Sequence, residues 1–115
     1  MARQWLLLFL PLLACCSKGP QADLQYISDA RSLAAEWALI NQQASEGKLT
    51  GVYVGSMHQW LRTQLQTDSA ALTQPKSAYG AEIAALLQQP DDAAPEALSA
   101  HADKLKHIED ALESA

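Results

Sequence analysis

The sequence predicts an all-α fold, a small up-and-down bundle of three to four helices built on an antiparallel helical hairpin. The chain beyond residue 20 is rich in alanine, leucine and glutamine and poor in β-branched residues, a composition that favours helices. Its apolar residues recur at intervals of three and four positions, which is the period of one helix face. Residues 21–115 are long enough for one hydrophobic core and too short for two. We therefore expect a single helical domain over this range.

The first helix is predicted at residues 21–46. Its apolar side chains are separated by steps of four, three, four, three and four positions, which places them in one stripe: Tyr26, Ala30, Leu33, Trp37, Ile40 and Ala44. Gly47 follows the stripe and is expected to cap the helix, because glycine adopts the left-handed backbone conformation without strain.

The second helix is predicted at residues 51–74, with Thr50 as its N-cap. Residues 51–55 place three β-prone residues between two glycines and could instead form a short strand. Helix is the preferred interpretation, because the same segment begins an apolar stripe of Val54, Met57, Leu61, Leu65 and Leu72. Pro75 ends the helix, since the residue before a proline is disfavoured in the α region.

Two shorter helices are predicted at residues 77–89 and 93–114. Ser77 can cap the first of them, Pro90 ends it, and Gly80 weakens it by about 1 kcal/mol relative to alanine. Its apolar side consists of Tyr79, Ile83 and either Leu86 or Leu87. The last helix tolerates Pro95 in its first turn. Its stripe consists of Leu98, His101, Leu105, Ile108 and Leu112.

The first two helices are of similar length and are joined by a tight glycine-containing turn, so they should fold back on one another. With the turn centred between Lys48 and Leu49, the two stripes match in register and Trp37 lies opposite Trp60. We expect both tryptophans to be buried and in contact. The side chains of Trp37, Met57 and Trp60 are also the candidates to line an apolar groove for a ligand or a partner helix, although aromatic residues of a small bundle more often fill its core.

The sequence predicts no catalytic, metal or cofactor site. Zinc sites on helices use histidines four positions apart, whereas His101 and His107 are six apart and His58 lies on another helix. The adjacent carboxylates at residues 91–92 and 109–110 are explained by helix capping and by a solvated helix face. No serine lies in a nucleophile motif, and no glycines form a phosphate loop. We therefore do not expect an enzyme.

The charge of the chain excludes one class of partner. Thirteen acidic residues stand against eight basic ones, and residues 91–115 hold seven of the acids but only two lysines. Nucleic-acid binding requires a basic surface that neutralises phosphates, so no nucleic-acid partner is expected.

The first sixteen residues have the pattern of an export signal. Arg3 and the amino terminus supply a basic start, and an apolar run follows that is too short to span a membrane, which takes about 20 residues. Leu12-Leu13-Ala14-Cys15 resembles the lipobox of bacterial lipoproteins. The resemblance implies that residues 1–14 are a signal peptide that is removed, that Cys15 is lipidated, and that residues 15–20 tether the domain. Cleavage before Cys16, or a conventional cut that releases a soluble protein, are the alternatives.

These expectations give a functional hypothesis. In the enteric sorting rule that the lipobox resemblance brings with it, aspartate after the lipidated cysteine retains a lipoprotein in the inner membrane. Cys16 at that position therefore implies the bacterial outer membrane, periplasmic side. We expect a lipid-anchored interaction or assembly protein with a protein partner. The alternatives are a binding module for a small apolar ligand or lipid, and an inhibitor or immunity-type protein for an exported enzyme, which would use the acidic C-terminal helix.

Overall fold

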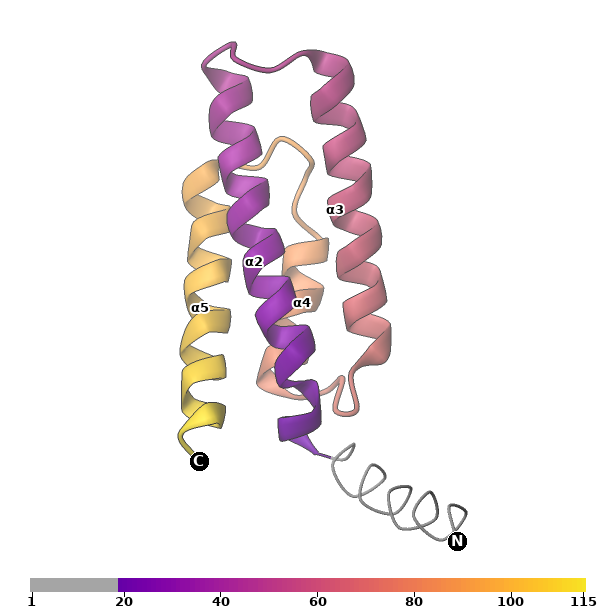
Figure 1. Cartoon of the computed structure of the whole chain (residues 1–115), viewed down its shortest axis with the longest axis vertical. Coiled ribbons are helices and arrows are strands. Elements are labelled where there is room, and N and C mark those ends of the chain that lie inside the picture. The colour runs from indigo at the N-terminus through magenta and orange to yellow at the C-terminus, as the bar shows by residue number, and fades with distance from the viewer. Residues whose placement is uncertain (1–18) are drawn as a thin grey trace, which may run out of the picture.

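The computed structural model describes residues 19–115, which form an all-α bundle with no strand among them. The four helices of this part of the chain run alternately up and down (Figure 1): α2 (Pro20–Ser45), α3 (Gly51–Ala71), α4 (Ala78–Leu87) and α5 (Pro95–Glu113). The predicted fold class is thus confirmed. Residues 51–55 form the first turn of α3 and not the alternative strand. Cys15 and the predicted signal peptide lie outside the described residues.

The predicted helix signals act as expected. Gly47 has a φ of 72° after the end of α2, in the left-handed region that favours glycine. The Thr50 side chain accepts a hydrogen bond from the Tyr53 amide, and the Ser77 side chain accepts one from the Gly80 amide. Pro95 occupies the first turn of α5.

Helix α3 ends at Ala71, three residues before the predicted end, because its end is set by a contact with α2. Leu72 leaves the helix with an extended backbone (φ −62°, ψ 136°) and turns its side chain into the core. The amide of Thr73 then donates to both carboxylate oxygens of Asp23, at 2.9 and 3.1 Å. A tertiary hydrogen bond therefore ends this helix before Pro75 can.

Asp23 itself is fully buried near the start of α2. Besides the Thr73 amide, it accepts hydrogen bonds from the Thr73 hydroxyl at 3.0 Å, the Gln74 amide at 3.2 Å and the Tyr79 hydroxyl at 2.6 Å. Burial alone would raise the pKa of the Asp23 carboxyl, but these hydrogen bonds outweigh it and lower the pKa below its ordinary value. One carboxylate thus anchors the whole α3–α4 connection to α2.

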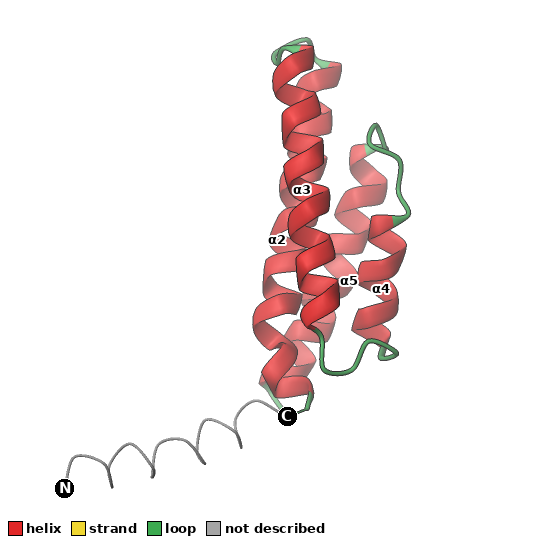
Figure 2. Cartoon of the chain, turned by 90° about the vertical axis from the view of Figure 1, so that its right-hand side faces the viewer, coloured by secondary structure: helices red, strands yellow, loops and turns green. Residues whose placement is uncertain are grey.

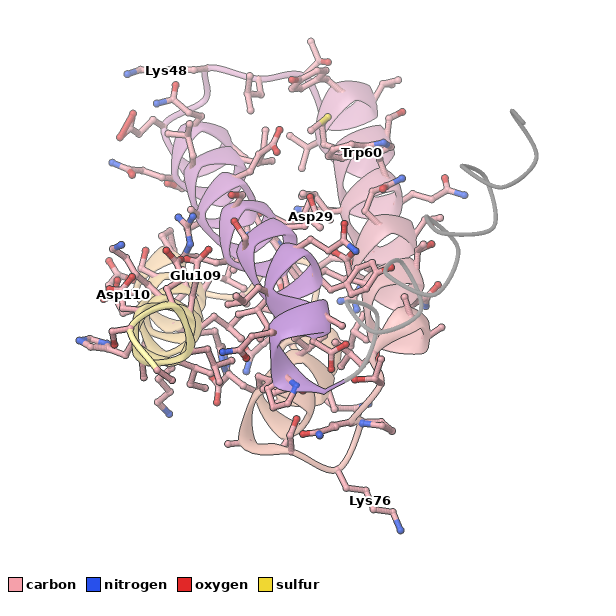
Figure 3. The ribbon with its side chains drawn as sticks, turned by 60° about the horizontal axis from the view of Figure 1, so that its bottom comes forward. Asp29, Lys48, Trp60, Lys76, Glu109 and Asp110 are labelled. Atoms are coloured by element: carbon pink, nitrogen blue, oxygen red, sulfur yellow. The ribbon has the colours of Figure 1, made fainter. Side chains whose placement is uncertain are left out.

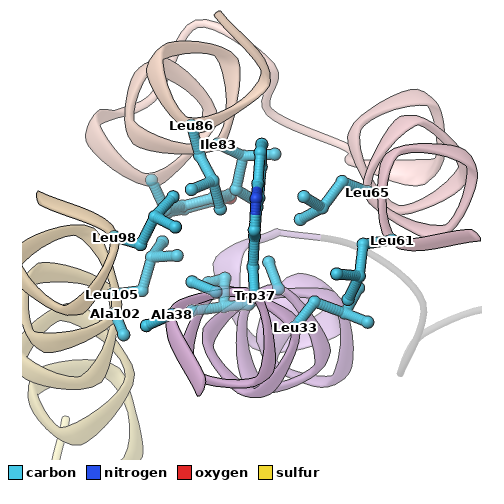
Figure 4. Packing of buried hydrophobic residues seen from close by; sticks show 14 of the residues in the cluster. Leu33, Trp37, Ala38, Leu61, Leu65, Ile83, Leu86, Leu98, Ala102 and Leu105 are labelled. Carbon is cyan, nitrogen blue, oxygen red and sulfur yellow. The ribbon is translucent and has the colours of Figure 1, made fainter. Parts of the chain in front are cut away.

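Helix α2 is the centre of the bundle, packed most extensively on α5 and next on α3. The side chain of Trp37 stands between the four helices, with leucines and isoleucine of α3, α4 and α5 around it (Figure 4). The fully buried core comprises Ile27, Ala30, Ala34, Trp37, Leu61, Leu65, Ile83, Leu86, Leu98 and Leu105. On α5 the buried face is centred on Ala102 and Leu105, so that His101, Ile108 and Leu112 lie at its edges and are only half-buried.

Gly80 is required by a close approach within the bundle. A Cβ at this position would lie 2.2 Å from the carbonyl oxygen of Pro75 and 2.7 Å from its carbonyl carbon, both of which are backbone atoms. The intrinsic helix-weakening effect of glycine is therefore accepted here because the preceding loop packs directly on α4.

The α2–α3 hairpin is longer than the other pair and projects beyond the α4–α5 connection (Figure 2). This leaves the upper end of α3 without a neighbour from α4 or α5. None of the helices among residues 19–115 combines the length and the apolar character that a membrane span requires.

Candidate functional site

Polar groups converge on Trp37 at the upper end of the core. The indole nitrogen of Trp37 donates to the backbone oxygen of Asp91 at 2.9 Å, and the guanidinium carbon of Arg62 lies 5.0 Å from the centre of the ring. The His58 ring approaches from α3, with ring centroids 6.4 Å apart. We refer to Trp37, Asn41, His58, Arg62 and Asp91 as the upper polar cluster.

The hydrogen bonds of this cluster identify Nε2 as a donor nitrogen of His58. Both protons of the Asn41 amide are used, because its nitrogen donates to the backbone oxygens of Asp91 at 2.9 Å and Ala93 at 2.8 Å. Its oxygen therefore faces Nε2 of His58, 2.7 Å away, and must accept from it. Nε2 of His58 therefore carries a proton and donates a hydrogen bond to α2 through Asn41.

Arg62 completes the cluster by holding the α4–α5 connection. Its guanidinium donates to the Asp91 carboxylate at 2.5 Å, to the backbone oxygen of Leu87 at 2.9 Å and to the backbone oxygen of Gln89. The connection is thus fixed to α2 and α3 through its backbone carbonyls. The donors of the cluster are occupied by intramolecular acceptors, so its clearest role is structural.

Two cavities lie near the upper end of the bundle. One, of about 290 Å³, is lined by Asn41, Ala44, Ser45, Val54, His58 and Asp92. The other, of about 570 Å³, lies between the end of α2 and the start of α5, and is lined by Gln42, Ser45, Pro95, Glu96, Ser99, Ala100 and Asp103. The first is at the small end of the range for ligand pockets and the second has a polar, acidic wall, whereas ligand pockets are mostly apolar. Neither is lined by Trp37, Met57 or Trp60.

A pair of carboxyl groups, Asp29 and Asp68, faces across the α2–α3 interface. Asp68 is buried, and its Oδ2 is a buried oxygen without a hydrogen-bond partner among the described residues, whereas Asp29 is exposed at the side where α2 meets α3 (Figure 3). Burial, together with a hydrogen bond to Asp29 and its negative charge, raises the pKa of Asp68 to about 8. Asp68 therefore holds its proton at neutral pH.

Acidic residues also gather on α5, where Glu109, Asp110 and Glu113 lie close enough for their oxygens to share one cation (Figure 3). The carboxylate of Glu109 is already paired with the Arg31 guanidinium at 2.8 Å, which links α5 to α2. The two other carboxylates are exposed. Exposed acidic groups of this kind are ordinary solvated charge, and we assign no metal site to them.

The exposed residues of α3 and α4 form a surface without a charged side chain, which we call the neutral face. The only charged residues of α3 are Asp68, which is buried, and Arg62, which is half-buried and bonded to the α4–α5 connection. The only charged residue of α4, Glu82, bonds to His101 of α5 at 2.5 Å. The neutral face consists of Gly51, Val52, Tyr53, Gly55, Ser56, Gln59, Trp60, Thr63, Gln66, Thr67, Ala70 and Ala71 of α3 with Ala78, Ala81, Ala84 and Ala85 of α4. The exposed side of α5, in contrast, bears Glu96, Asp103, Lys104, Lys106, Asp110 and Glu113.

The structure separates the residues of the predicted groove. Trp37 is fully buried in the core, Met57 is half-buried, and Trp60 is 45% exposed. The expectation that both tryptophans are buried is therefore wrong for Trp60, and the aromatic ring that lies beside Trp37 on α3 belongs to His58. The reason is the rotation of α3 about its own axis: His58 and Leu61 face the core, and Trp60, about 100° round the helix from Leu61, lies on the outward side.

Sequence reasoning missed five buried polar residues: Asp23, Asn41, His58, Asp68 and Glu109. A signal for them was present, since each follows or precedes an apolar stripe residue by three or four positions. The prediction that His101 lies on the apolar stripe of the last helix agrees better with the structure, because that side chain is half-buried and bonds to Glu82 and Gln89.

The chain matches no known protein family, no curated protein and no solved structure. The site must therefore be interpreted from its own geometry.

Proposed function

We propose that this protein is a small lipid-anchored interaction or assembly protein of the bacterial outer membrane, that Cys15 carries the lipid, and that the neutral face docks a protein. The lipobox-like sequence before Cys15 supports the anchor. The composition of the neutral face supports the docking role, and it is the observation on which the proposal depends.

The neutral face has the character of a protein–protein interface. Interface centres are depleted of charged residues and enriched in tyrosine, tryptophan and methionine. Val52, Tyr53 and Trp60 are 84%, 46% and 45% exposed, and they are three of the four large apolar side chains that the described residues leave exposed. In a chain of net charge −5, a helix of 21 residues whose outward side chains are all uncharged is a strong departure from the rest of the surface.

The position of the face relative to the tether suits this role. Helix α2 begins at Pro20, directly after the tether, and its 26 residues carry the chain about 40 Å to the hairpin turn. The aromatic end of α3 starts at that turn, at the opposite end of the bundle from residue 20 (Figure 1). A lipid on Cys15 would thus allow the exposed aromatic residues to stand well away from the membrane surface.

Two measurements test the proposal. Growth with radiolabelled palmitate should label the wild-type protein and leave Cys15→Ser unlabelled and released from membranes, whereas a labelled Cys15→Ser variant would contradict the anchor. Cross-linking in intact cell envelopes should then compare Gln59→Glu, which places a charge on the neutral face, with Gln42→Glu, which places the same charge on an exposed position of α2. Loss of cross-linked complexes in Gln59→Glu alone supports the docking role, and equal behaviour of the two variants refutes it.

A further inference from the structure

We propose that the neutral face binds a second copy of this chain, with α3 packed antiparallel on α3 of the other copy. This inference rests on the proposed docking role of the face and names its occupant.

The absence of charged side chains on the neutral face favours a partner that is itself acidic, as a second copy of this chain is. Residues 19–115 carry thirteen acidic and six basic side chains, a net charge of −7, so two copies repel one another wherever charged surfaces meet. The neutral face itself contributes no charged side chain, so a second copy that meets it there with its own neutral face brings no two face residues of the same charge together. A basic partner, in contrast, would gain most by docking on the acidic side of α5.

The α3 surface is also complementary to itself. A two-fold dimer presents the same patch from each copy, so residues pair reciprocally. Leu61 is the midpoint of Gly51–Ala71, and an antiparallel pair centred there places Val52 opposite Ala70 of the second copy. Ser56 then meets Gln66 and Gln59 meets Thr63 in the same register. Each pair joins a smaller side chain to a larger one, and none joins two charges.

The size of the face predicts a reversible dimer. Helix α3 is about 31 Å long and α4 about 15 Å, and a helix with its side chains is about 10–12 Å wide. Helix α3 therefore contributes on the order of 350 Å² per copy, and α4 beside it adds about 150 Å² where the second copy also covers it. A standard stable interface buries about 800 Å² per partner, so this face lies near the lower end of specific interfaces. We therefore expect association in the micromolar range, favoured by the high local concentration that anchoring in one membrane provides.

Sedimentation equilibrium of the full-length lipidated protein in density-matched detergent tests the inference. From about 1 to about 200 μM, wild type and Gln42→Glu should shift from monomer to dimer with similar dissociation constants. Gln59→Glu should weaken the dimer at least tenfold, because each copy places an unpaired charge in the interface. Circular dichroism of both variants shows whether the helices remain intact. A wild-type protein that stays monomeric throughout, or a dimer weakened equally by both variants, overturns the inference.

The same variants separate this inference from the proposed function. A monomeric wild type, combined with loss in Gln59→Glu of envelope cross-links to a different protein, would refute self-association and keep the docking role. If the lipid-free Cys15→Ser chain floats with phosphatidylethanolamine–phosphatidylglycerol vesicles, and Gln59→Glu abolishes flotation, then the occupant is a lipid surface and both proposals fail.

Discussion

Replacing Asp68 with asparagine should change how the stability of the bundle depends on pH. The folded state holds the Asp68 proton up to about pH 8, mainly because the carboxyl is buried and also because Asp29 faces it. In the unfolded chain the same group titrates near its ordinary value of 3.8. Between these two values the folded state binds a proton that the unfolded state has released. The free energy of unfolding therefore falls as the pH rises through this window.

The size of the effect follows from the linkage slope. One proton difference is equivalent to about 1.4 kcal/mol per pH unit, so Asp68 should destabilise the wild type by about 2–3 kcal/mol between about pH 5 and about pH 7. Asparagine has the shape of a protonated aspartate and cannot ionise. Asp68→Asn should consequently match the wild type only below about pH 4, exceed its stability already at about pH 5, and gain a further increment of about 2–3 kcal/mol over it by about pH 7. Urea unfolding followed by tryptophan fluorescence measures both, since Trp37 is fully buried and reports loss of the core.

Two further variants make the test specific. Asp29→Asn removes the neighbouring charge but leaves Asp68 buried, so it should reduce the pH slope without abolishing it. Asp103→Asn changes an exposed carboxyl and should leave the slope as it is in the wild type. Parallel stability curves for wild type and Asp68→Asn from pH 5 to pH 7 would refute the reasoning, because they would show that Asp68 is ionised in the folded protein.

Three other changes probe the packing. Asp23→Ala should cost about 3–5 kcal/mol, because the buried Tyr79 hydroxyl and the Thr73 and Gln74 amides lose their acceptor. Chemical denaturation at pH 7 measures this, and a cost below about 1 kcal/mol would contradict it. Gly80→Ala should destabilise the bundle by about 1–3 kcal/mol through overpacking, whereas Gly55→Ala, whose Cβ would point into open space, should stabilise it by up to about 1 kcal/mol. Thermal unfolding should therefore show melting temperatures that shift in opposite directions. Shifts in the same direction would exclude the close approach at Gly80. Trp37→Ala should cost about 3–5 kcal/mol and Trp60→Ala far less, so comparable losses in urea unfolding would mean that Trp60 is part of the core.

The helices and their caps could be predicted because they depend on local rules. Thr50, Gly47 and Ser77 act through neighbours within a few positions, so the printed sequence contains all of the information that they require. The end of α3 could not be predicted in this way. It depends on Asp23, which is about fifty positions away from the amide of Thr73 that it binds.

The burial of Trp60 was mispredicted for a related reason. Apolar stripes treat only apolar residues as buried, and Trp60 was therefore placed on the inward side of α3, although it is 45% exposed. The buried face of α3 includes His58 and Asp68, which lie three positions before Leu61 and three after Leu65. A polar residue at stripe spacing is thus a usable sign of burial, but its partner is not predictable, because it comes from another helix or from a loop.

The neutral face is the feature of the surface that the fold itself does not require. Helix α2 fixes the α3–α4 and α4–α5 connections through side-chain hydrogen bonds to backbone groups, from Asp23 at one end and from Trp37 and Asn41 at the other. The inward side of α3 supplies its core residues and Arg62, and these are sufficient to hold the helix in place. Charged residues on its outward side would cost the fold nothing and would favour solubility. An outward face with exposed tyrosine and tryptophan and no charge is therefore the physical basis of the proposed contact with another molecule, and Gln59→Glu is the variant that tests it first.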